Sequence, residues 1–332
     1  MARRLNVGLR EGDAVASNYE AICEENRKRY GTDIGRIGPM LLADRYDDRT
    51  HFIFELLQNA EDALGKRGMW SGPRRVTFSL APDMLSLSHF GRPFDEADVR
   101  GVCGIAESTK DQFSIGRFGI GFKSVYTFTD RPEIHSGEED FTVENYVQPK
   151  RVTRTERAGD ETQIVLPLKP EDATAQDEIT AGFKRLGPGA LLFLRNIDEI
   201  NWAVQSGGSG TYLRSSPVAL GANVQRITVI GQESGQSEVD QNWLVFHRNV
   251  FTLGREQVGR VEVAFSLQPV KDRPGRWMVV PVAASPLVVF FPTAVETNLG
   301  FLVQGPYKTT PTRTRRWWSR PRRHVRRSPT GR

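Results

Sequence analysis

The sequence predicts an α+β chain in which a layered α/β domain is followed by a region built mostly of strands. Residues 50–64 carry apolar side chains at helical spacing. Two short segments, 75–80 and 84–89, alternate apolar and polar residues as strands do. Beyond residue 201, strand-like runs follow one another with turn residues between them. A single amphipathic helix buries its apolar face against a sheet, which favours the layered domain.

The remaining elements are predicted from the same patterns. Residues 19–29 form a short surface helix, 95–102 a second helix, and 122–126 the start of a helix after a glycine-rich turn. Glycines make 205–210 a surface turn. Further strands are predicted at residues 163–168, 191–194, 224–231, 242–253, 259–268 and 276–291.

The composition is that of a globular chain. Its 332 residues, 38% hydrophobic and 26% charged, are enough for about two domains. The longest apolar runs, 190–194 and 287–291, are far shorter than the roughly 20 residues that cross a bilayer. The first residues include arginines but no apolar segment typical of a signal peptide, so we expect a cytoplasmic protein without a membrane span.

Neither the cysteines nor the histidines indicate a metal centre. Cys23 and Cys103 are too few and too far apart for a disulfide framework or a zinc site, which suits a reducing compartment. No metal-ligand spacing links His51, His135 and His247, which are interpreted as surface or strand residues.

Positive charge is concentrated at the end of the chain. The net charge is +5, yet the segment from Lys308 to Arg332 holds one lysine, nine arginines and no acid. Subtracting those ten charges leaves −5 for residues 1–307. An arginine-rich tail with two tryptophans suits a nucleic-acid arm, since arginines contact phosphates and tryptophans stack on bases. Residues 313–332 have few apolar residues and no periodicity, so we favour a disordered tail produced by a shifted reading frame or truncation.

One face of the helix predicted at residues 50–64 carries Glu55, Asn59 and Asp62. They stand at i, i+4 and i+7, so they share a narrow strip at about 100° per residue. A carboxamide oxygen suits Mg²⁺, and a nearby carboxylate can orient or deprotonate a water. From this helix alone, a solvated polar face is the simpler explanation.

A second pattern is the glycine-rich segment 114–126, with Gly116, Gly119 and Gly121 before a predicted helix. Glycines let backbone N–H groups approach an anion, and a helix N-terminus adds partial positive charge, so the segment suits phosphates. The segment lacks the GK[ST] that would identify a P-loop. A tight turn therefore explains the same glycines more simply. The order is more informative: polar-faced helix, strand pair ending near Gly91, polar loop, then glycine segment.

That order and those strings resemble the GHKL superfamily, which includes gyrase, the ninety-kilodalton heat-shock chaperone, histidine kinases and MutL. FELLQNAEDA is similar to the family's N-box, and IAESTK with SIGRFGIGFKSVYTFTD is similar to the chaperone's lid and second glycine box. YDDRTHFIFELLQNAEDA and FPTAVETNLGFLVQGPYKTT look most like sacsin and its bacterial relatives. The resemblance covers residues 40–312. It implies the Bergerat fold, a two-layer α/β sandwich with a mixed sheet and helices on one face, followed by a β-rich second domain.

The resemblance also implies a role for each matching residue. Glu55 would be the general base that activates water, and Asn59 would be the Mg²⁺ ligand. Asp62 would be a polar partner on the purine or water side, and Thr162 would lie beside the base. Lys110 would belong to the lid. The phosphates would be held by Gly116, Gly119 and Gly121 with the amides around Phe122.

Other basic and polar residues are candidates by position only. Lys123 either faces phosphate or is solvated. A following domain usually supplies a contact to the γ-phosphate, for which the candidates are Gln304, Lys308 and Arg313.

The first glycine box departs from the family pattern. That box reads Asp-x-Gly-x-Gly, and its Asp accepts a hydrogen bond from the adenine amino group. Here His89 and Pro93 replace the Asp and the second glycine, while Gly91 is retained and Phe90 is unusual. A neutral His can accept one hydrogen bond, but a changed polar contact in a buried site alters specificity by large factors. Adenine selectivity is therefore left open.

The leading hypothesis is a nucleotide-gated switch. ATP and Mg²⁺ bind, a lid at residues 106–113 closes, and slow hydrolysis through Glu55 resets the switch, with a chaperone-like, defence or DNA-associated output. The alternatives are a degenerate nucleotide-binding or scaffold module without turnover, and a nucleic-acid binder that uses the tail. The implied partners are ATP and an unknown protein client, with nucleic acid only through the tail. The predicted domains are a helical lead-in (1–50), an ATP-binding domain (51–200) and a β-rich domain (201–312).

Overall fold

The computed structural model describes residues 16–31, 34, 48–105, 121–251, 254 and 257–306. The helical elements are α1 (Tyr19–Tyr30), η1 (Arg49–His51), α3 (Phe52–Gly65), α4 (Glu96–Cys103), η2 (Phe122–Thr127), α5 (Ala175–Leu186) and η3 (Pro188–Leu191). The strands are β1 (Arg75–Leu80), β2 (Met84–His89), β3 (Glu133–Ser136), β4 (Glu139–Glu144), β5 (Gln148–Arg151), β6 (Thr162–Pro167), β7 (Glu199–Val204), β8 (Ser209–Arg214), β9 (Val218–Gly221), β10 (Val224–Glu233), β11 (Val239–Phe251), β12 (Gln257–Pro269), β13 (Trp277–Val280), β14 (Pro286–Val289), β15 (Phe291–Glu296) and β16 (Leu302–Gln304).

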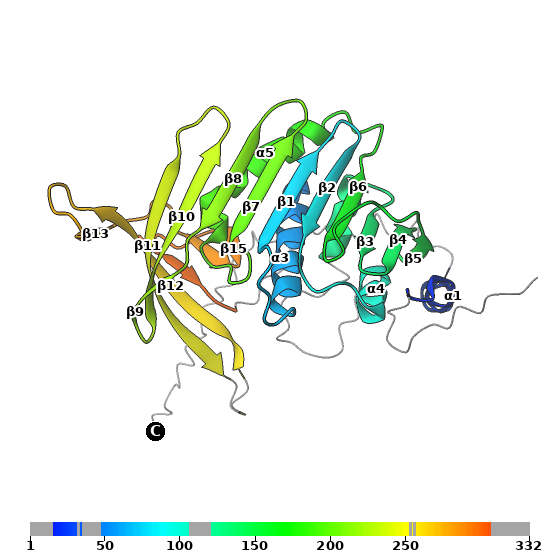
Figure 1. Ribbon diagram of the computed structural model, residues 1–332, viewed down its shortest axis with the longest axis horizontal. Helices are drawn as coiled ribbons and strands as arrows, with labels where there is room; N and C mark the ends of the chain where they lie inside the picture. Colours follow the sequence, from blue (N-terminus) through cyan, green and yellow to red (C-terminus); the bar gives the residue numbers. More distant parts are fainter. Residues whose placement is uncertain are drawn as a thin grey trace, which may run out of the picture.

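Within these residues the chain is mixed α/β, with one large mixed sheet and few helices (Figure 1). The strand order is β15-β14-β16-β12-β11-β10-β8-β7-β1-β2-β6-β3-β4-β5, with β13 beside β12 and β9 beside β10. The pairs β1–β7 and β14–β16 are parallel. The sheet therefore continues from the helix-covered half into the β-rich half without a break. It is more extensive than the sequence predicted.

One face of the first half of the sheet is apolar, and helices cover it. Along β1, Val76, Phe78 and Leu80 are buried, and the residues between them are more exposed. Helix α5 packs on this face through Phe183, whose ring centroid lies 5.3 Å from that of Phe78. The same ring stacks on Trp202 of β7 at 5.7 Å. The predicted layered arrangement is present in this half.

Helix α3 lies close to its neighbours because two glycines lack side chains. A Cβ added at Gly182 of α5 would lie 2.7 Å from Cδ1 of Ile53. A Cβ added at Gly91, just after β2, would lie 2.5 Å from Cβ of Ala63. Both distances are too short for non-bonded carbons, so a side chain at either position would push the helix away from its support.

The predicted helices and the strand pair are confirmed with small shifts at their ends. The helix at 50–64 begins as η1, which Asp48 caps by accepting from the N–H of Thr50, and continues as α3. Asp95 caps α4 in a capping box with Asp98. The strands predicted at 75–80 and 84–89 form an antiparallel pair. The helix predicted from residue 122 is a short 3₁₀ helix.

The β-rich half confirms the predicted strands beyond residue 224. Strands β10, β11 and β12 form a long antiparallel ladder, and the run at 276–291 divides into β13 and β14. No helix in the described part of the chain is long and apolar enough to span a membrane.

The strand predicted at residues 191–194 is wrong. Pro188 begins the 3₁₀ helix η3, and Leu192 to Leu194 follow as buried turns that fill the core. A short apolar run does not by itself distinguish a strand from another buried segment. The strand predicted at 163–168 is confirmed as β6, whereas strands β3, β4, β5, β7, β8, β9, β15 and β16 and helix α5 were not predicted.

Several predictions lie outside the described residues. They concern the lid with Lys110, the glycines Gly116 and Gly119, the candidates Lys308 and Arg313, and the tail. The domain boundaries near residues 50, 200 and 312 stay predictions.

Candidate functional site

Helix α3 places Glu55, Asn59 and Asp62 along one face, as their spacing predicted. Asn59 is buried, and its Nδ2 has no hydrogen-bond partner within the described ranges. This unpaired N–H donor suits an acceptor atom of an added ligand. The amide oxygen of Asn59 and the carboxylate of Glu55 are the atom types that a hard cation such as Mg²⁺ prefers.

Glu55 is held by the residue one turn earlier. Its Oε1 lies 3.0 Å from Nε2 of His51, and the two side chains are 20% and 14% exposed. The interpretation of His51 as a surface or strand residue is therefore wrong. It lies in η1, where the i,i+4 spacing brings its ring to the carboxylate. His135 and His247 do lie in strands.

Asp62 has an unusual protonation equilibrium. Burial, followed by the negative charge of Glu61, raises the pKa of the Asp62 carboxyl from 3.8 to about 7. Near neutral pH this group can therefore both hold and release a proton.

Glu61, which belongs to no recognised motif position, has a structural role. Its carboxylate accepts hydrogen bonds from the backbone N–H groups of Arg195, Asn196 and Ile197 at 2.7 to 3.0 Å. This fixes the segment that leads into β7 against α3. Its signal in the sequence is its position four residues after Leu57, within the apolar row of the helix.

The last glycine of the predicted phosphate segment lies against Glu55. A Cβ built at Gly121 would be 2.2 Å from Oε2 of Glu55, so no other residue fits without displacing the carboxylate. Gly121 precedes η2, in which the side chain of Phe122 is buried. Two segments that are distant in sequence thus meet at the carboxylate predicted to be the base.

His89 ends β2 on the helix-covered face, where it is buried. Its Nδ1 accepts a hydrogen bond from the N–H of Gly91 at 3.0 Å. Burial, with a smaller contribution from the charge of Arg67, lowers its pKa to about 4, so the ring is neutral at pH 7. A neutral ring that accepts at Nδ1 carries its proton on Nε2, which is then a donor.

Thr162 lies beside His89 in the register of β2 and β6. Its Oγ1 shares a 2.6 Å hydrogen bond with Oγ of Ser136, the adjacent residue on β3. Ser136 Oγ also accepts from the N–H of Phe94, at 3.0 Å. The sheet thus brings His89, Thr162 and Ser136 into one row. Ser136 was missed, because no motif marks it and only the strand register reveals it.

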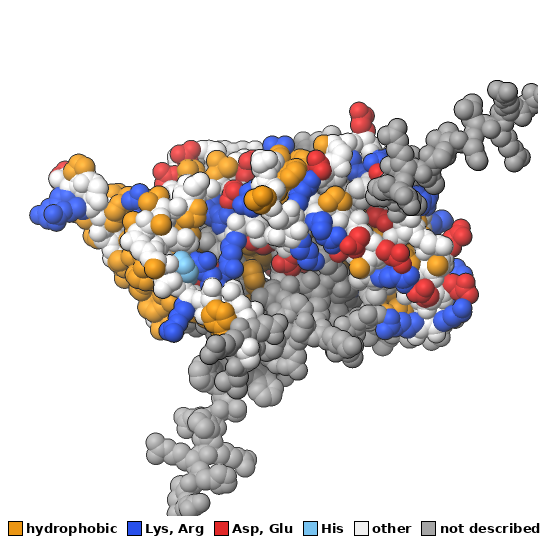
Figure 2. Space-filling view, turned by 60° about the horizontal axis from the view of Figure 1, so that its bottom comes forward, with side chains coloured by type: hydrophobic (Ala, Val, Ile, Leu, Met, Phe, Trp, Pro, Cys, Tyr) orange, Lys and Arg blue, Asp and Glu red, His pale blue; other side chains and the backbone are white. Residues whose placement is uncertain are grey.

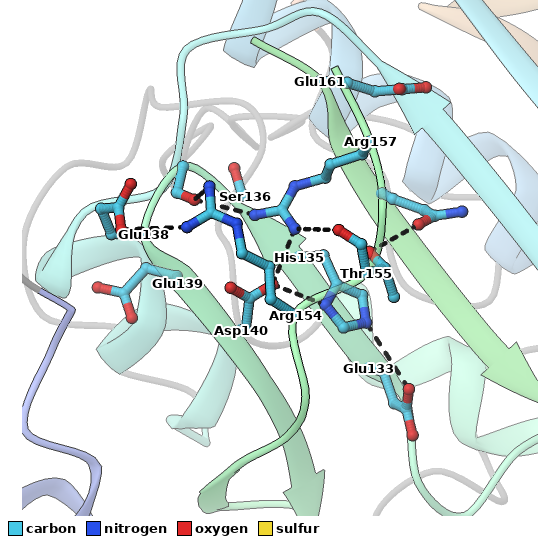
Figure 3. Close-up of polar contacts among 12 residues, drawn as sticks. Glu133, His135, Ser136, Glu138, Glu139, Asp140, Arg154, Thr155, Arg157 and Glu161 are labelled. Carbon is cyan, nitrogen blue, oxygen red and sulfur yellow. Dashed lines mark hydrogen bonds and ion pairs between the residues drawn. The ribbon is translucent and has the colours of Figure 1, made fainter. Parts of the chain in front are cut away.

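A buried polar network supports β3 from the opposite face of the sheet (Figure 3). Asp140 is 2.8 Å from Nδ1 of His135 and accepts from Arg157 at 2.9 Å. Arg157 also donates to the carbonyl of Gly137 at 2.9 Å. These bonds hold the β3–β4 hairpin and, with it, the position of Ser136.

Lys123 has neither of the roles considered from the sequence. It is buried, and its Nζ donates to the carbonyl of Val102 at 2.6 Å and to the carbonyl of Tyr146. Burial lowers its pKa to about 8. The ammonium ties η2 to α4 and to the turn after β4.

Gln304 lies in β16 beside Glu262 of β12. It is buried, and its Oε1 has no hydrogen-bond partner among described residues. The same portion of the chain contains no group of three or more His, Cys, Asp or Glu residues arranged to hold a metal.

Comparison with known proteins finds matches to parts of this chain. A family model for the Sacsin domain matches residues 87–152, a segment that includes His89, Gly91, Gly121 and Ser136. The protein is also similar to chaperones named HtpG. Together these matches show that parts of the chain are similar to the Sacsin domain, to Sacsin and to chaperones named HtpG.

The particular relatives are large. The chain is 26% identical over 309 residues to Protein NO VEIN of Arabidopsis thaliana, covering 84% of this chain and 11% of that protein. It is 30% identical over 167 residues to human Sacsin, covering 41% of this chain and 3% of Sacsin. It is 28% identical over 188 residues to Chaperone protein HtpG of Sulfurovum sp. (strain NBC37-1), covering 46% of this chain and 30% of HtpG. The chain thus spans a small part of the relatives it matches.

Proposed function

We propose that this chain binds ATP with Mg²⁺ in a Bergerat-type site and hydrolyses it slowly, acting as a nucleotide-gated switch. The contact between Gly121 and Glu55 carries the proposal. It joins the predicted phosphate segment to the predicted base. The similarity to HtpG chaperones supports a chaperone-like output on a protein client, in the cytoplasm.

Residues of α3 would have separate roles in binding the cation and activating water. The amide oxygen of Asn59 would hold the cation, and the carboxylate of Glu55 would orient the attacking water and take its proton. His51 would keep Glu55 in place through the 3.0 Å contact. Mg²⁺, when bound, would neutralise negative charge on the phosphates.

The base side of the site would differ from the family pattern. Since Gly91 occupies Nδ1 of His89, the ring offers a donor at Nε2 and no free acceptor. We expect it to donate to a ring nitrogen of the purine instead of accepting from the adenine amino group. Thr162 and Ser136 would lie beside it.

The β-rich half contacts the helix at the proposed base. Phe54, the neighbour of Glu55, has its ring centroid 4.9 Å from that of Phe291 in β15. A change at Glu55 on nucleotide binding would therefore reach the β-rich half directly.

The same His89 observation favours a second candidate, a degenerate nucleotide-binding or scaffold module without turnover. A site that has lost its acceptor for the amino group would bind adenine weakly, because mismatched buried polar groups are costly.

Calorimetric titration of ATP into the full chain, with and without Mg²⁺, tests the proposal. We expect binding that depends on Mg²⁺ and that Asn59→Ala abolishes, while Asn249→Ala, an exposed asparagine on β11, leaves binding unchanged. Glu55→Gln should retain binding and reduce hydrolysis by about 100-fold or more. Binding of Mg²⁺ and ATP without hydrolysis by the unmutated protein would favour the degenerate module. No binding by a folded protein would favour the scaffold.

A further inference from the structure

A cavity of about 370 Å³ lies where the helix-covered half of the sheet meets the β-rich half. Its lining residues come from the segment before β1, the segment between η3 and β7, the segment between β8 and β9, and strands β8, β10 and β12. We call it the arginine cavity. Its charged lining residues are Arg74, Arg195, Asp198, Arg214, Arg260 and Glu262. Figure 2 brings the lower end of Figure 1 forward and shows basic side chains gathered in the middle of this face.

The arginine cavity has more positive than negative charge. Four guanidinium groups face two carboxylates. Arg214 is paired with Asp198 at 2.6 Å, and Arg260 lies 3.1 Å from Glu262. Among the described residues no carboxylate lies within ion-pair distance of Arg74. Arg195 also lies 3.8 Å from Oε2 of Glu262, so Glu262 is shared by two arginines and the cavity keeps a net surplus of about two positive charges.

Several polar atoms of the cavity are buried without hydrogen-bond partners in the part of the chain that the structure describes. They are Nε of Arg74, Nε of Arg214 and Nε of Arg260. Nη2 of Arg260 and Oε2 of Glu262 also lack hydrogen bonds, although they lie 3.1 Å from Oε1 of Glu262 and 3.8 Å from Nη2 of Arg195 as ion pairs. The side chains of Arg214 and Glu262 are only 6% and 5% exposed. Buried polar atoms normally have hydrogen-bond partners. The concentration of unpaired polar atoms in one cavity therefore indicates a binding site whose ligand would supply the missing hydrogen bonds.

Burial is the main influence on the pKa of the two titratable groups beside the cavity, and the arginines act second. Burial, with the charges of Arg260 and Arg195, lowers the pKa of His247, which pairs with Glu262 across β11 and β12. His247 therefore adds no positive charge near pH 7. Burial raises the pKa of Glu262, which the arginines counteract.

We propose that the arginine cavity binds a phosphate monoester, with its phosphate among the guanidinium groups and a hydroxyl or amine donor at Oε2 of Glu262. A phosphate monoester carries a charge of about −1.5 to −2 near pH 7, which matches the surplus. The planar, forked guanidinium group donates two parallel hydrogen bonds to such an oxyanion. The cavity volume is in the range of small-molecule sites.

Such a ligand would connect three parts of the protein. It would contact the segment before β1, the strand β12 and the turn that carries Arg195. The N–H of Arg195 is bonded to Glu61 of α3, so the site also adjoins the helix of the proposed nucleotide site. This site does not depend on ATP binding, since none of its residues belongs to that proposal.

The test is calorimetric titration of the full chain with inorganic phosphate and with phosphoserine. We expect Arg260→Gln to weaken binding by about tenfold or more, because it removes a charge-assisted donor. Glu262→Gln should tighten binding of inorganic phosphate by about threefold, because it removes a like charge. Arg248→Gln, an exposed arginine on β11, is the control and should change nothing. Arg74→Gln should also weaken binding, and it replaces Arg260→Gln if that variant does not fold.

Three results would overturn the proposal. They are no binding of either probe, equal weakening by Arg248→Gln, and loss of phosphate binding in Asn59→Ala, which would place the anion in the nucleotide site. If the protein fails to bind ATP but still binds phosphate, the proposed ATPase function is contradicted and the proposed phosphate site is not. Comparing free phosphoserine with phosphoserine in a short peptide identifies the source: tighter peptide binding indicates a phosphorylated protein, and equal binding indicates a small metabolite. Both results support the monoester chemistry.

Discussion

The two halves of the sheet differ in how they are covered. In the first half, α3 and α5 cover one face, and the alternate residues of β1 and β2 are buried beneath them. In the β-rich half, many large apolar side chains are exposed, and Figure 2 shows hydrophobic side chains gathered over that end. They include Val218, Leu220, Val239, Phe246, Phe251, Met278, Val279, Val295 and Leu299.

This difference shows where stability and chemistry reside. A face covered by helices excludes water, so a single Glu, His or Asp there has a strongly altered environment. The β-rich half relies on long strand pairing and contributes fewer fully buried side chains. We therefore expect substitutions in the covered half to have the larger effects on folding.

The largest effect is expected for the core of the covered half. Phe52→Ala removes a fully buried ring of α3 that packs on Phe128 at 5.4 Å, and should lower the free energy of unfolding by about 3 to 5 kcal/mol. Phe246→Ala, at a ring 40% exposed on β11, should cost about 1 kcal/mol or less. Urea unfolding of both variants measures the difference. Equal losses would show that the two halves are equally packed.

A medium effect is expected where the covered half joins β7. Glu61→Gln replaces a carboxylate that accepts three backbone N–H groups, and should cost about 2 kcal/mol, because hydrogen bonds to a buried charge are strong. Glu171→Gln, at an exposed position before α5, should be neutral. Thermal unfolding distinguishes them. An unchanged melting temperature for Glu61→Gln would mean that the segment 195–197 is held by other contacts.

The smallest effect is expected from pH. The folded pKa of Asp62, about 7, lies above its ordinary value of 3.8, so the folded state binds a proton that the unfolded state has lost. Stability should therefore fall as pH rises from about 4 to about 7. Asp62→Asn should remove this dependence and stabilise the protein at pH 8, because the folded state no longer has to bury a charged carboxylate. Water screens this half-buried group, so we expect a gain of only about 1 to 2 kcal/mol.

Asp240→Asn, at an exposed position of β11, serves as the control for this pH series. It should leave the pH dependence as it is in the unmutated protein. A slope between pH 4 and 7 that survives in Asp62→Asn would assign the titration to another group.

Local periodicity explains which elements could be predicted. Helix α3 and the pair β1–β2 each have one covered face, so their sequences alternate or repeat visibly. Strand β4 is buried along nearly its whole length on both faces, under α1 on one side and Arg157 on the other, so it shows no alternation. The run at 191–194 is apolar because it fills the core, which any buried segment can do.

The candidate site divides in the same way. The spacing of Glu55, Asn59 and Asp62 was readable because a helix repeats every 3.6 residues. The roles of Ser136 and Glu61 could not be predicted from the sequence, because their hydrogen-bond partners lie far away in the chain. The roles proposed for the glycines and for Thr162 stay predictions that nucleotide binding must test.

By itself the sequence determined the helix, the strand pair, the β-rich second half and the order of the motifs, because each depends on residues close together in the chain. Tertiary structure decided the rest: which nitrogen of His89 is free, that Gly121 meets Glu55, and that four arginines surround one cavity. Those features depend on strand register and close packing between distant segments. A change of one residue in register would move each side chain to the opposite face of the sheet.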